Sequence, residues 1–149
     1  MIRIATSADL PRIVEMAEKF FRQTKMYSVT GFDEESIKKT FSFLDGEKGV
    51  CYVLEIDGHV VGMVGALAYE FYMNLSIRIG QELFWWVDDD HRGSSGSIKM
   101  MKAIEEWAKK AGCVSFAMIA LDGIDHEKVC SIYSRLGYSK SEYVYVKEL

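Results

Sequence analysis

The chain has 149 residues, which fits one domain with a sizeable core, and we expect a single domain over residues 1–149. Its formal net charge of -4 argues against nucleic acid or an anionic membrane as a partner, and its 49% hydrophobic and 27% charged residues are typical of a soluble globular protein. No apolar run approaches the roughly 18 residues that span a bilayer, and the N-terminus lacks a signal-peptide core. The cysteines, Cys51, Cys113 and Cys130, are odd in number and widely spaced, which favours a reducing cytoplasm.

The N-terminal part of the chain predicts a strand and two helices. Residues 2–6 alternate between apolar and polar side chains, as a strand does. Thr6 and Asp9 have the spacing of a capping box, and Pro11 falls in the first turn, where a helix tolerates proline. The following helix carries an apolar stripe made of Leu10, Ile13, Val14, Ala17, Phe20 and Phe21. A second amphipathic helix is predicted to begin near Asp33.

The middle of the chain predicts a hairpin and a further strand. Residues 50–56 and 60–72 are two apolar runs, and Asp57 and Gly58 lie between them. This dipeptide is typical of a tight hairpin turn, so the two runs should pair antiparallel. Residues 82–87, with the sequence ELFWWV, form a strongly apolar strand.

The C-terminal part alternates helices and strands. The pattern predicts a helix over 95–111, a strand over 114–121, a helix over 125–136 and a last strand over 138–146. A glycine directly follows each helix, in the position where a helix end needs a left-handed residue. The order β-α-α-β-β-β-α-β-α-β indicates an α/β fold (a mixed α+β sheet) with helices on both faces. Its strand-helix-strand unit should be parallel with a right-handed crossover.

One loop carries the strongest chemical signal. It lies between the strand at 82–87 and the next helix. Backbone N–H groups at a helix start are unpaired, glycines let the backbone approach a bulky anion, serines add hydroxyl donors, and arginine supplies a forked cation suited to phosphate. These features predict a diphosphate-binding loop made of Arg92, Gly93, Ser94, Ser95, Gly96 and Ser97.

The same loop also fits an ordinary capped helix after a polar turn, since Ser and Gly are common at N-caps. It is not a P-loop, because no Gly-Lys-Ser/Thr closes it, and it lacks the G-x-G-x-x-G pattern of a dinucleotide site. The preceding aspartates, Asp88 to Asp90, could ligate a metal, but consecutive aspartates usually form a solvated turn, and we expect no metal site.

Two motifs give the sequence its family resemblance. Residues 82–101, ELFWWVDDDHRGSSGSIKMM, are similar to the strand, loop and helix of the GNAT superfamily of acyl-CoA-dependent N-acyltransferases. About 40 residues later, His126, Val129, Tyr133 and Gly137-Tyr138 resemble that family's Asn-x-x-Ala-x-x-x-Tyr-x-x-x-Gly-Phe segment. The order of elements resembles the family's fold as well, so the resemblance covers nearly the whole chain.

The resemblance implies a site for acetyl-CoA. It implies that the strand 82–87 splays from the strand 114–121 and that pantetheine lies in the gap, paired with backbone groups near Trp86 and Val87. An N–H there would polarise the thioester carbonyl. Trp85 is adjacent to this contact, although both tryptophan side chains are expected to be core residues on opposite faces. His126 stands in the second cofactor-binding segment.

The resemblance also implies an acid and a base. Tyr133 is expected to protonate the leaving thiolate, with a core tyrosine as the alternative. Glu82 is expected to deprotonate the incoming amine, directly or through water. Its apolar neighbours should raise its pKa, which suits a base. The alternative for Glu82 is an exposed charge at a strand end, with His91 or His126 as other proton carriers.

The sequence is compatible with three functions. The leading hypothesis is an N-acetyltransferase that moves acetyl from acetyl-CoA to a primary amine, on a small molecule or a peptide, by direct attack in a ternary complex. The second is a non-catalytic acyl-CoA-binding module or sensor. The third, a nucleotide-binding α/β domain, is disfavoured by the antiparallel hairpin. A homodimer is a further expectation, because the apolar strands could pair between subunits as they do in some members of the family.

Overall fold

A computed structural model describes residues 1–123 and 125–149. Within these residues the chain forms one sheet of five strands in the order β1-β2-β3-β4-β5. The strands β1 to β4 pair antiparallel with their neighbours, and β4 pairs with β5 in parallel. The predicted mixed, largely antiparallel sheet is therefore confirmed.

The elements follow the sequence pattern through most of the chain. The strands are β1 (Ile2–Ile4), β2 (Gly49–Ile56), β3 (His59–Phe71), β4 (Asn74–Val87) and β5 (Cys113–Ala117). The helices are α1 (Leu10–Phe21), α2 (Tyr27–Thr30), α3 (Glu34–Leu44), α4 (Ser95–Lys110) and α5 (His126–Arg135). Strand β4 is longer than the predicted run, because it also takes in residues 74–81, and the short α2 has no counterpart in the prediction.

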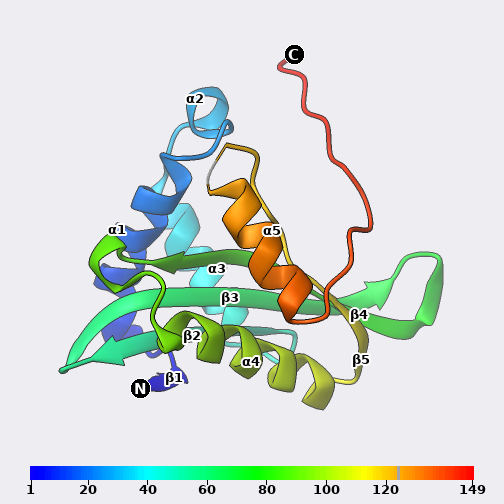
Figure 1. Cartoon of the computed structure of the whole chain (residues 1–149), viewed down its shortest axis with the longest axis horizontal. Coiled ribbons are helices and arrows are strands. Elements are labelled where there is room, and N and C mark those ends of the chain that lie inside the picture. Colours follow the sequence, from blue (N-terminus) through cyan, green and yellow to red (C-terminus); the bar gives the residue numbers. More distant parts are fainter. Residues whose placement is uncertain (124) are drawn as a thin grey trace.

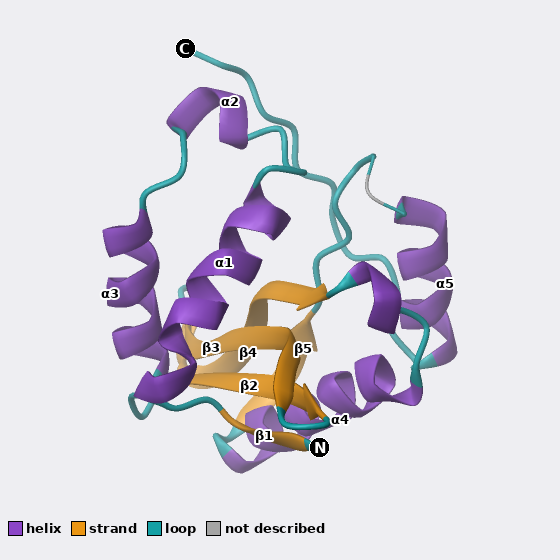
Figure 2. Ribbon diagram, turned by 90° about the vertical axis from the view of Figure 1, so that its left-hand side faces the viewer, coloured by secondary structure: helices purple, strands orange, loops and turns teal. Residues whose placement is uncertain are grey.

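Helices cover both faces of the sheet, as Figures 1 and 2 show. One face packs against α1 and α3 through a core that includes Ile13, Leu44 and Trp86. The other face packs against α4 through a core that includes Val64 and Ile104. Burial of two apolar cores, one per face, is what holds this three-layer arrangement together.

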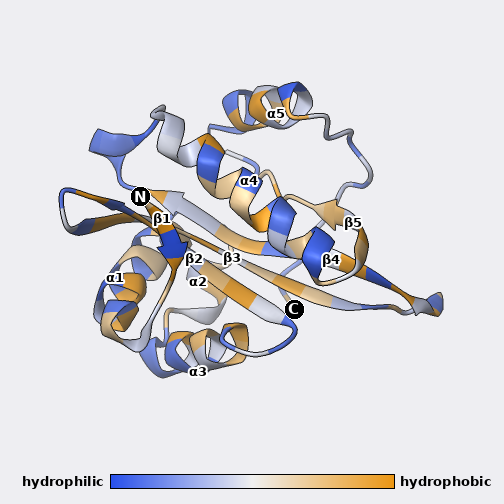
Figure 3. Cartoon of the chain, turned by 90° about the horizontal axis from the view of Figure 1, so that it is seen from below, coloured by the Kyte–Doolittle hydropathy of each residue, from blue (hydrophilic) through white to orange (hydrophobic). Residues whose placement is uncertain are grey.

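Hydrophobic residues follow the same layers (Figure 3). The central strands are mostly apolar, because both of their faces are covered. Helix α4 is amphipathic, with Met100, Met101 and Ile104 buried and its lysines outside. No helix among the described residues combines the length and apolarity that a membrane crossing requires.

The hairpin turn and the helix ends behave as predicted. Asp57 and Gly58 both have positive φ, 50° and 77°, as the primed turns of tight hairpins require. Gly112 and Gly137, which follow α4 and α5, have φ of 81° and 92°. These are left-handed conformations that glycine adopts without a Cβ penalty, so each glycine ends its helix where the sequence indicates.

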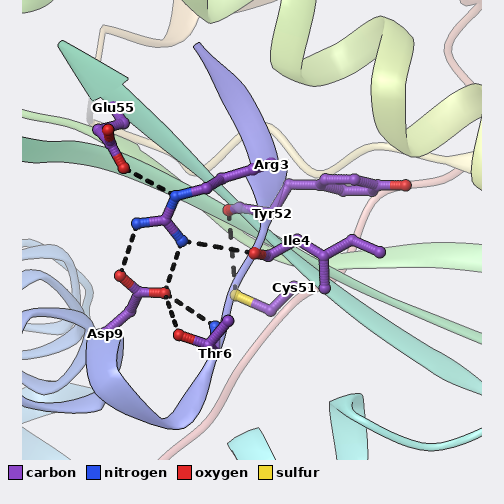
Figure 4. A network of polar contacts seen from close by, with 7 residues as sticks. All are labelled: Arg3, Ile4, Thr6, Asp9, Cys51, Tyr52 and Glu55. Atoms are coloured by element: carbon purple, nitrogen blue, oxygen red, sulfur yellow. Dashed lines mark hydrogen bonds and ion pairs between the residues drawn. The ribbon is translucent and has the colours of Figure 1, made fainter. Parts of the chain in front are cut away.

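A partly buried ion pair connects the first strand to the start of the first helix (Figure 4). Arg3 donates two hydrogen bonds to the Asp9 carboxylate, from Nη1 to Oδ2 at 2.7 Å and from Nη2 to Oδ1 at 2.8 Å. The backbone N–H and the hydroxyl of Thr6 also donate to Asp9 Oδ2, which confirms the predicted capping box. Arg3 Nε donates to Glu55 Oε2 at 2.7 Å and so connects the network to β2.

Two predicted strands differ from the structure. The strand predicted over 114–121 ends at Ala117, and residues 118–121 continue as irregular chain. The strand predicted over 138–146 is absent, and residues 139–149 run as an exposed, irregular tail. The first difference arises where β4 and β5 separate. The second arises because the tail has no strand beside it, and an alternating sequence forms a strand only where backbone groups find partners.

Candidate active site

The strands β4 and β5 diverge in the middle of β4. Their pairing includes Gly80 with Phe116 and Gln81 with Ala117, and it stops there. Beyond Gln81, residues 82–87 stay paired with β3 on the other side. Among the described residues, no strand therefore lies beside the backbone edge that faces away from β3, which confirms the predicted splayed pair. A gap of this kind offers backbone N–H and C=O groups to an extended ligand.

A β-bulge lies at the start of this divergence. Gly65 of β3 pairs with Phe84, and the next residue, Ala66, pairs with Glu82, so Leu83 is the extra residue. A bulge re-aims neighbouring backbone groups and increases the local twist. Nothing in the sequence around Leu83 predicts it, because a bulge depends on the register between two strands.

Glu82 is a buried carboxyl at this point. It is 3% exposed and accepts one hydrogen bond from the described residues, from the N–H of Ile119 at 3.0 Å. Burial raises the pKa of Glu82 to about 7, although the bond from Ile119 lowers it in part. The expected raised pKa is therefore present, and Glu82 is not the exposed strand-end charge of the alternative interpretation.

Tyr133 of α5 lies close to the same group. Its hydroxyl donates to the carbonyl oxygen of Ile119 at 2.9 Å. Its ring is 6.3 Å from the ring of Trp85 and 5.8 Å from that of Tyr138. Burial, with the nearby Glu82 carboxyl, raises the pKa of Tyr133, so the phenol stays protonated and can act as a donor.

Ile119 thus joins the two candidate catalytic side chains. Its N–H donates to Glu82 and its carbonyl accepts from Tyr133, so both side chains form hydrogen bonds with the backbone of one residue. The N–H and the carbonyl of Ile119 therefore bond to side chains and not to the backbone of β4, in keeping with the end of β5 at Ala117. Sequence reasoning missed Ile119, because backbone contacts leave no signal in a side-chain pattern.

The two tryptophans lie on opposite faces, as predicted. Trp86 belongs to the core under α1, and Trp85 packs against the core under α4. Trp86 Nε1 donates to Asp88 Oδ1 at 3.1 Å, and Arg12 of α1 forms an ion pair with the same carboxylate. Asp88 therefore anchors the end of β4 and does not belong to a merely solvated turn.

The predicted diphosphate-binding loop forms the turn before α4 and the first turn of that helix. Gly93 has a φ of 76° and turns the chain. Ser94 follows in an extended conformation, and α4 begins at Ser95. Two buried polar side-chain atoms have no partner within the described residues, the hydroxyl of Ser94 and the Nε1 of Trp85. Buried polar atoms normally have hydrogen-bond partners, so these two are exceptions among the described residues.

The structure gives Gly96 a packing role that the sequence pattern does not predict. A Cβ on Gly96 would lie 2.8 Å from Cδ2 of Leu54 in β2. The glycine therefore allows α4 to pack closely on the sheet. Ser95 and Ser97 flank it in the first turn, and the N–H of Ser97 bonds to the carbonyl of Ser94 at 3.3 Å.

The Arg92 side chain contacts neighbouring residues of β4 and of the turn that follows it. Its Nε donates to the carbonyl of Val87 at 2.9 Å, and its Nη1 lies 2.9 Å from Asp89. Its guanidinium carbon lies 4.6 Å from the centroid of the Trp86 ring, a cation–π contact. In this arrangement the arginine fixes the bend between β4 and α4, and its charge remains beside the loop.

His126 begins α5 on the other side of the gap. Its Nδ1 lies 3.3 Å from the carbonyl of Leu121, and its Nε2 lies 3.5 Å from Sγ of Cys130. Both ring nitrogens therefore contact this chain. Across residues 1–123 and 125–149, no three His, Cys, Asp or Glu side chains gather closely enough to hold a metal ion.

The fold is shared with known acetyltransferases. The aminoglycoside antibiotic 6'-N-acetyltransferase AAC(6')-IG from Acinetobacter haemolyticus superposes with a TM-score of 0.74 at 21% identity, over 100% of this chain and 99% of that one. AAC(6')-Iy in complex with a bisubstrate analogue, CoA-S-monomethyl-acetylneamine, gives 0.80 at 15%, over 99% and 95%. Glucosamine-6-phosphate N-acetyltransferase from Arabidopsis thaliana gives 0.70 at 18%, over 99% and 96%.

Sequence comparison points to the same group of proteins. Comparison with curated protein sequences returns no significant match. The family model described as "Acetyltransferase (GNAT) family" matches residues 10–138, which is most of the chain and includes both motifs. The chain therefore belongs to the acetyltransferase (GNAT) family.

Proposed function

We propose that residues 1–149 form one domain that transfers acetyl from acetyl-CoA to a primary amine by direct attack in a ternary complex. The observation that carries this proposal is the divergence of β4 from β5 after Gln81, with a buried glutamate at its start. The gap leads along residues 82–87 to the start of α4. In this proposal the thioester lies at one end of the unpaired edge of β4 and the diphosphate lies at the other.

Acetyl-CoA fits the unpaired donors around this gap. Its diphosphate would lie on the loop of Arg92, Gly93, Ser94, Ser95, Gly96 and Ser97. The unpartnered Ser94 hydroxyl and the N–H groups at the start of α4 would donate to the phosphates. Backbone groups near Trp86 and Val87 would pair with the pantetheine amides. Trp85 and His126 would line the two sides.

Glu82 and Tyr133 then divide the proton transfers. Glu82 accepts a proton from the incoming ammonium, directly or through water, and its pKa of about 7 suits this role near neutral pH. The free amine attacks the thioester carbonyl carbon, and the C–S bond breaks as the C–N bond forms. The sulfur leaves as a thiolate, and the Tyr133 hydroxyl protonates it. The proton that the nitrogen must still lose to become an amide passes, directly or through water, to the Tyr133 phenolate and restores the phenol. The Tyr133 hydroxyl must first leave the Ile119 carbonyl, whereas Glu82 can take a proton on Oε1 while Oε2 still accepts from Ile119.

The acceptor is proposed to be a cationic small-molecule amine or a peptide amine. The AAC(6') enzymes and the glucosamine-6-phosphate enzyme that share the fold act on amino sugars, according to their names. The formal net charge of -4 would also favour a positively charged acceptor. We propose a cytoplasmic location and, as partners, neither nucleic acid nor membrane.

The experiment combines binding with turnover. Calorimetry should show that acetyl-CoA binds, and that Arg92→Ala weakens binding by roughly 1.5–3 kcal/mol, the range for hydrogen bonds to charged groups. Part of that loss would come from a loosened loop, because Arg92 bonds Val87. Free CoA thiol should then appear in proportion to an added amine from a panel of aminoglycosides, amino sugars and peptides. No binding of acetyl-CoA would contradict the proposal.

One observation favours a second function, an acyl-CoA-binding module without catalysis. In the structure the backbone of Ile119 occupies both Glu82 and Tyr133. If the bond from Tyr133 persists when acetyl-CoA is bound, its hydroxyl cannot protonate the leaving thiolate, although Glu82 keeps its second carboxylate oxygen for a proton. Binding of acetyl-CoA without CoA release for any amine in the panel would support the module.

A further inference from the structure

Helix α5 carries a cysteine and a histidine in contact. Nε2 of His126 lies 3.5 Å from Sγ of Cys130, which follows four residues later on the same face of the helix. Nδ1 of the same ring lies 3.3 Å from the carbonyl oxygen of Leu121. A carbonyl can only accept, so we assign the proton of the neutral ring to Nδ1, which leaves the lone pair of Nε2 for the Cys130 thiol. A nucleophile, a base and a group that orients the base are therefore in place.

The other two cysteines have different surroundings. Cys51 is buried, and burial raises its pKa to about 12. Burial also raises the pKa of Cys113 in β5, although the nearby Arg78 lowers it in part. In the described part of the chain, only the Cys130 thiol has a histidine within hydrogen-bond distance. The thiolate is the nucleophile in cysteine chemistry, so the cysteine with a base beside it should react first.

Cys130 lies beside the gap between β4 and β5. It precedes Tyr133 by three residues, so the two side chains are neighbours on the helix surface, about 4.5 Å apart along its axis. After burial, the nearby Glu82, Tyr138 and Cys130 raise the pKa of Tyr133 further. The Tyr133 ring packs against Trp85 of β4. The thiol is therefore close to the side chain that we assign to the CoA sulfur.

We propose that Cys130 is a site of thiol–disulfide exchange with CoA disulfide, which attaches CoA covalently to the protein. This inference rests on the proposed function, because that function brings the CoA sulfur to the Tyr133 hydroxyl. His126 takes the thiol proton as Cys130 Sγ attacks the nearer sulfur of the CoA disulfide. A new S–S bond forms and the old one breaks. The second CoA leaves as a thiolate and receives the proton from His126, so one disulfide replaces another without a further oxidant.

The attached CoA would block the acetyl-CoA site. Its diphosphate and pantetheine would bind the same loop and the same gap as those of acetyl-CoA. A tethered ligand has an effective concentration of about the mM range, so free acetyl-CoA would not displace it. A small thiol reverses the reaction by the same exchange. Acetyl transfer would therefore stop when the CoA pool is oxidised and resume when it is reduced.

The first experiment measures the mass of the intact chain. The reduced chain, freed of reductant, is incubated with CoA disulfide and separately with glutathione disulfide, which has the same S–S bond and no diphosphate. We expect one CoA per chain, located at Cys130 by peptide mass. CoA disulfide should react at least about tenfold faster than glutathione disulfide, because binding brings its sulfur to the thiol. Cys130→Ser should abolish the adduct, and Cys113→Ser, the matched control, should keep it.

Two further variants separate the base from the binding loop. His126→Asn removes the base and keeps the thiol, so it should slow the exchange at least about tenfold with both disulfides. Arg92→Ala should slow the reaction with CoA disulfide alone. In calorimetry the purified adduct should not bind acetyl-CoA, and dithiothreitol should restore binding.

Three results would overturn the exchange site. They are attachment at Cys113 in place of Cys130, equal rates with the two disulfides, and an unchanged rate in His126→Asn. If the unmodified chain binds acetyl-CoA and acetylates an amine while Cys130 stays free in CoA disulfide, the exchange fails and the proposed function stands. A chain that does not bind acetyl-CoA would contradict the proposed function itself, and the exchange with it.

Discussion

Two buried carboxylates in this molecule have opposite environments. Asp9, at the start of the α1 segment, is 8% exposed, and Glu82, in β4, is 3% exposed. Burial alone would raise the pKa of both, because it disfavours the charged form. Yet the pKa of Asp9 is lowered to about 2, and that of Glu82 is raised to about 7.

The difference lies in the partners. The carboxylate of Asp9 accepts four hydrogen bonds, two from the Arg3 guanidinium and two from Thr6. These bonds, with Arg3 first, outweigh the cost of burial. Glu82 accepts one bond from a neutral N–H, and burial dominates. No arginine, lysine or histidine pairs with it among the ion pairs of the described residues.

This comparison separates a structural charge from a chemical one. Asp9 is satisfied by the fold and has no capacity left for a ligand. Glu82 is kept close to the midpoint of its titration at neutral pH, which costs stability and leaves it able to exchange a proton. The predictions below test whether the two carboxylates differ in this way.

The largest expected effect is on turnover of Glu82→Gln. The variant keeps the shape of the side chain and loses its basicity. Near pH 7 the kcat/KM for an identified amine should fall by about 10²–10⁴-fold, the usual contribution of a positioned base. The deficit should shrink at alkaline pH, where free amine forms without help. The measurement is a pH profile of kcat/KM for both forms.

Asp9→Asn is the matched control for this profile. It removes a carboxylate of similar burial that we assign to structure, so its activity per folded molecule should stay close to that of the unchanged protein. Parallel profiles for Glu82→Gln and the unchanged protein would show that Glu82 is not the base.

The second prediction concerns Tyr133, the other side chain that bonds to the backbone of Ile119. Tyr133→Phe keeps the ring against Trp85 and removes the hydroxyl that would protonate the thiolate. Turnover should fall by about 10²–10⁴-fold with little change in acetyl-CoA affinity. Stability should drop by only about 1 kcal/mol for the lost bond to the Ile119 carbonyl. Single-turnover kinetics and calorimetry measure these quantities, and full turnover in the variant would make the tyrosine structural.

Local signals allowed most of the fold to be predicted from the sequence. The Asp57-Gly58 turn, the glycines after α4 and α5 and the capping box at Asp9 each act over a few residues, so they can be read without knowing the fold. Glu82 and Tyr133 were found through family motifs, and the raised pKa of Glu82 follows from its apolar neighbours.

What could not be predicted depends on contacts between distant segments. The role of Ile119, the bulge at Leu83 and the packing of Gly96 on Leu54 each require a register or a neighbour that no local pattern contains. The predicted strand over 138–146 shows the same limit. Alternation predicts the side-chain pattern of a strand, but its partner must come from elsewhere.

The third prediction is that Glu82→Gln changes stability with pH. The pKa of Glu82 rises from an ordinary 4.5 to about 7 in the folded protein, so the folded state binds a proton that the unfolded state has lost between these values. The contribution of Glu82 to the free energy of unfolding is fully present below about pH 4.5 and is lost as the pH rises through 7. The loss is on the order of 3 kcal/mol.

The glutamine variant has no such loss. The free energy of unfolding of the variant, minus that of the unchanged protein, should therefore grow from pH 5 to pH 8. Urea unfolding at each pH measures both values. Taking the difference between the two proteins removes the titration of all other groups. A difference that is flat over this range would mean that Glu82 stays ionised in the folded state.

The smallest effect is expected for Asp9→Asn, and its pH dependence should be opposite in sign. The pKa of Asp9 falls from an ordinary 3.8 to about 2 on folding, so its contribution is present above about pH 4 and is lost as pH falls through 2. The variant should lose about 2 kcal/mol at pH 7, and this deficit should shrink below pH 4. Glu18→Gln, which breaks the exposed pair with Arg22, is the control and should cost much less, because solvent screens an exposed pair. Urea unfolding between pH 7 and pH 3 measures all three proteins. If the Asp9→Asn deficit were as small as that of the control, the four hydrogen bonds would only balance the cost of burying the carboxylate, and the contrast with Glu82 would rest on burial alone.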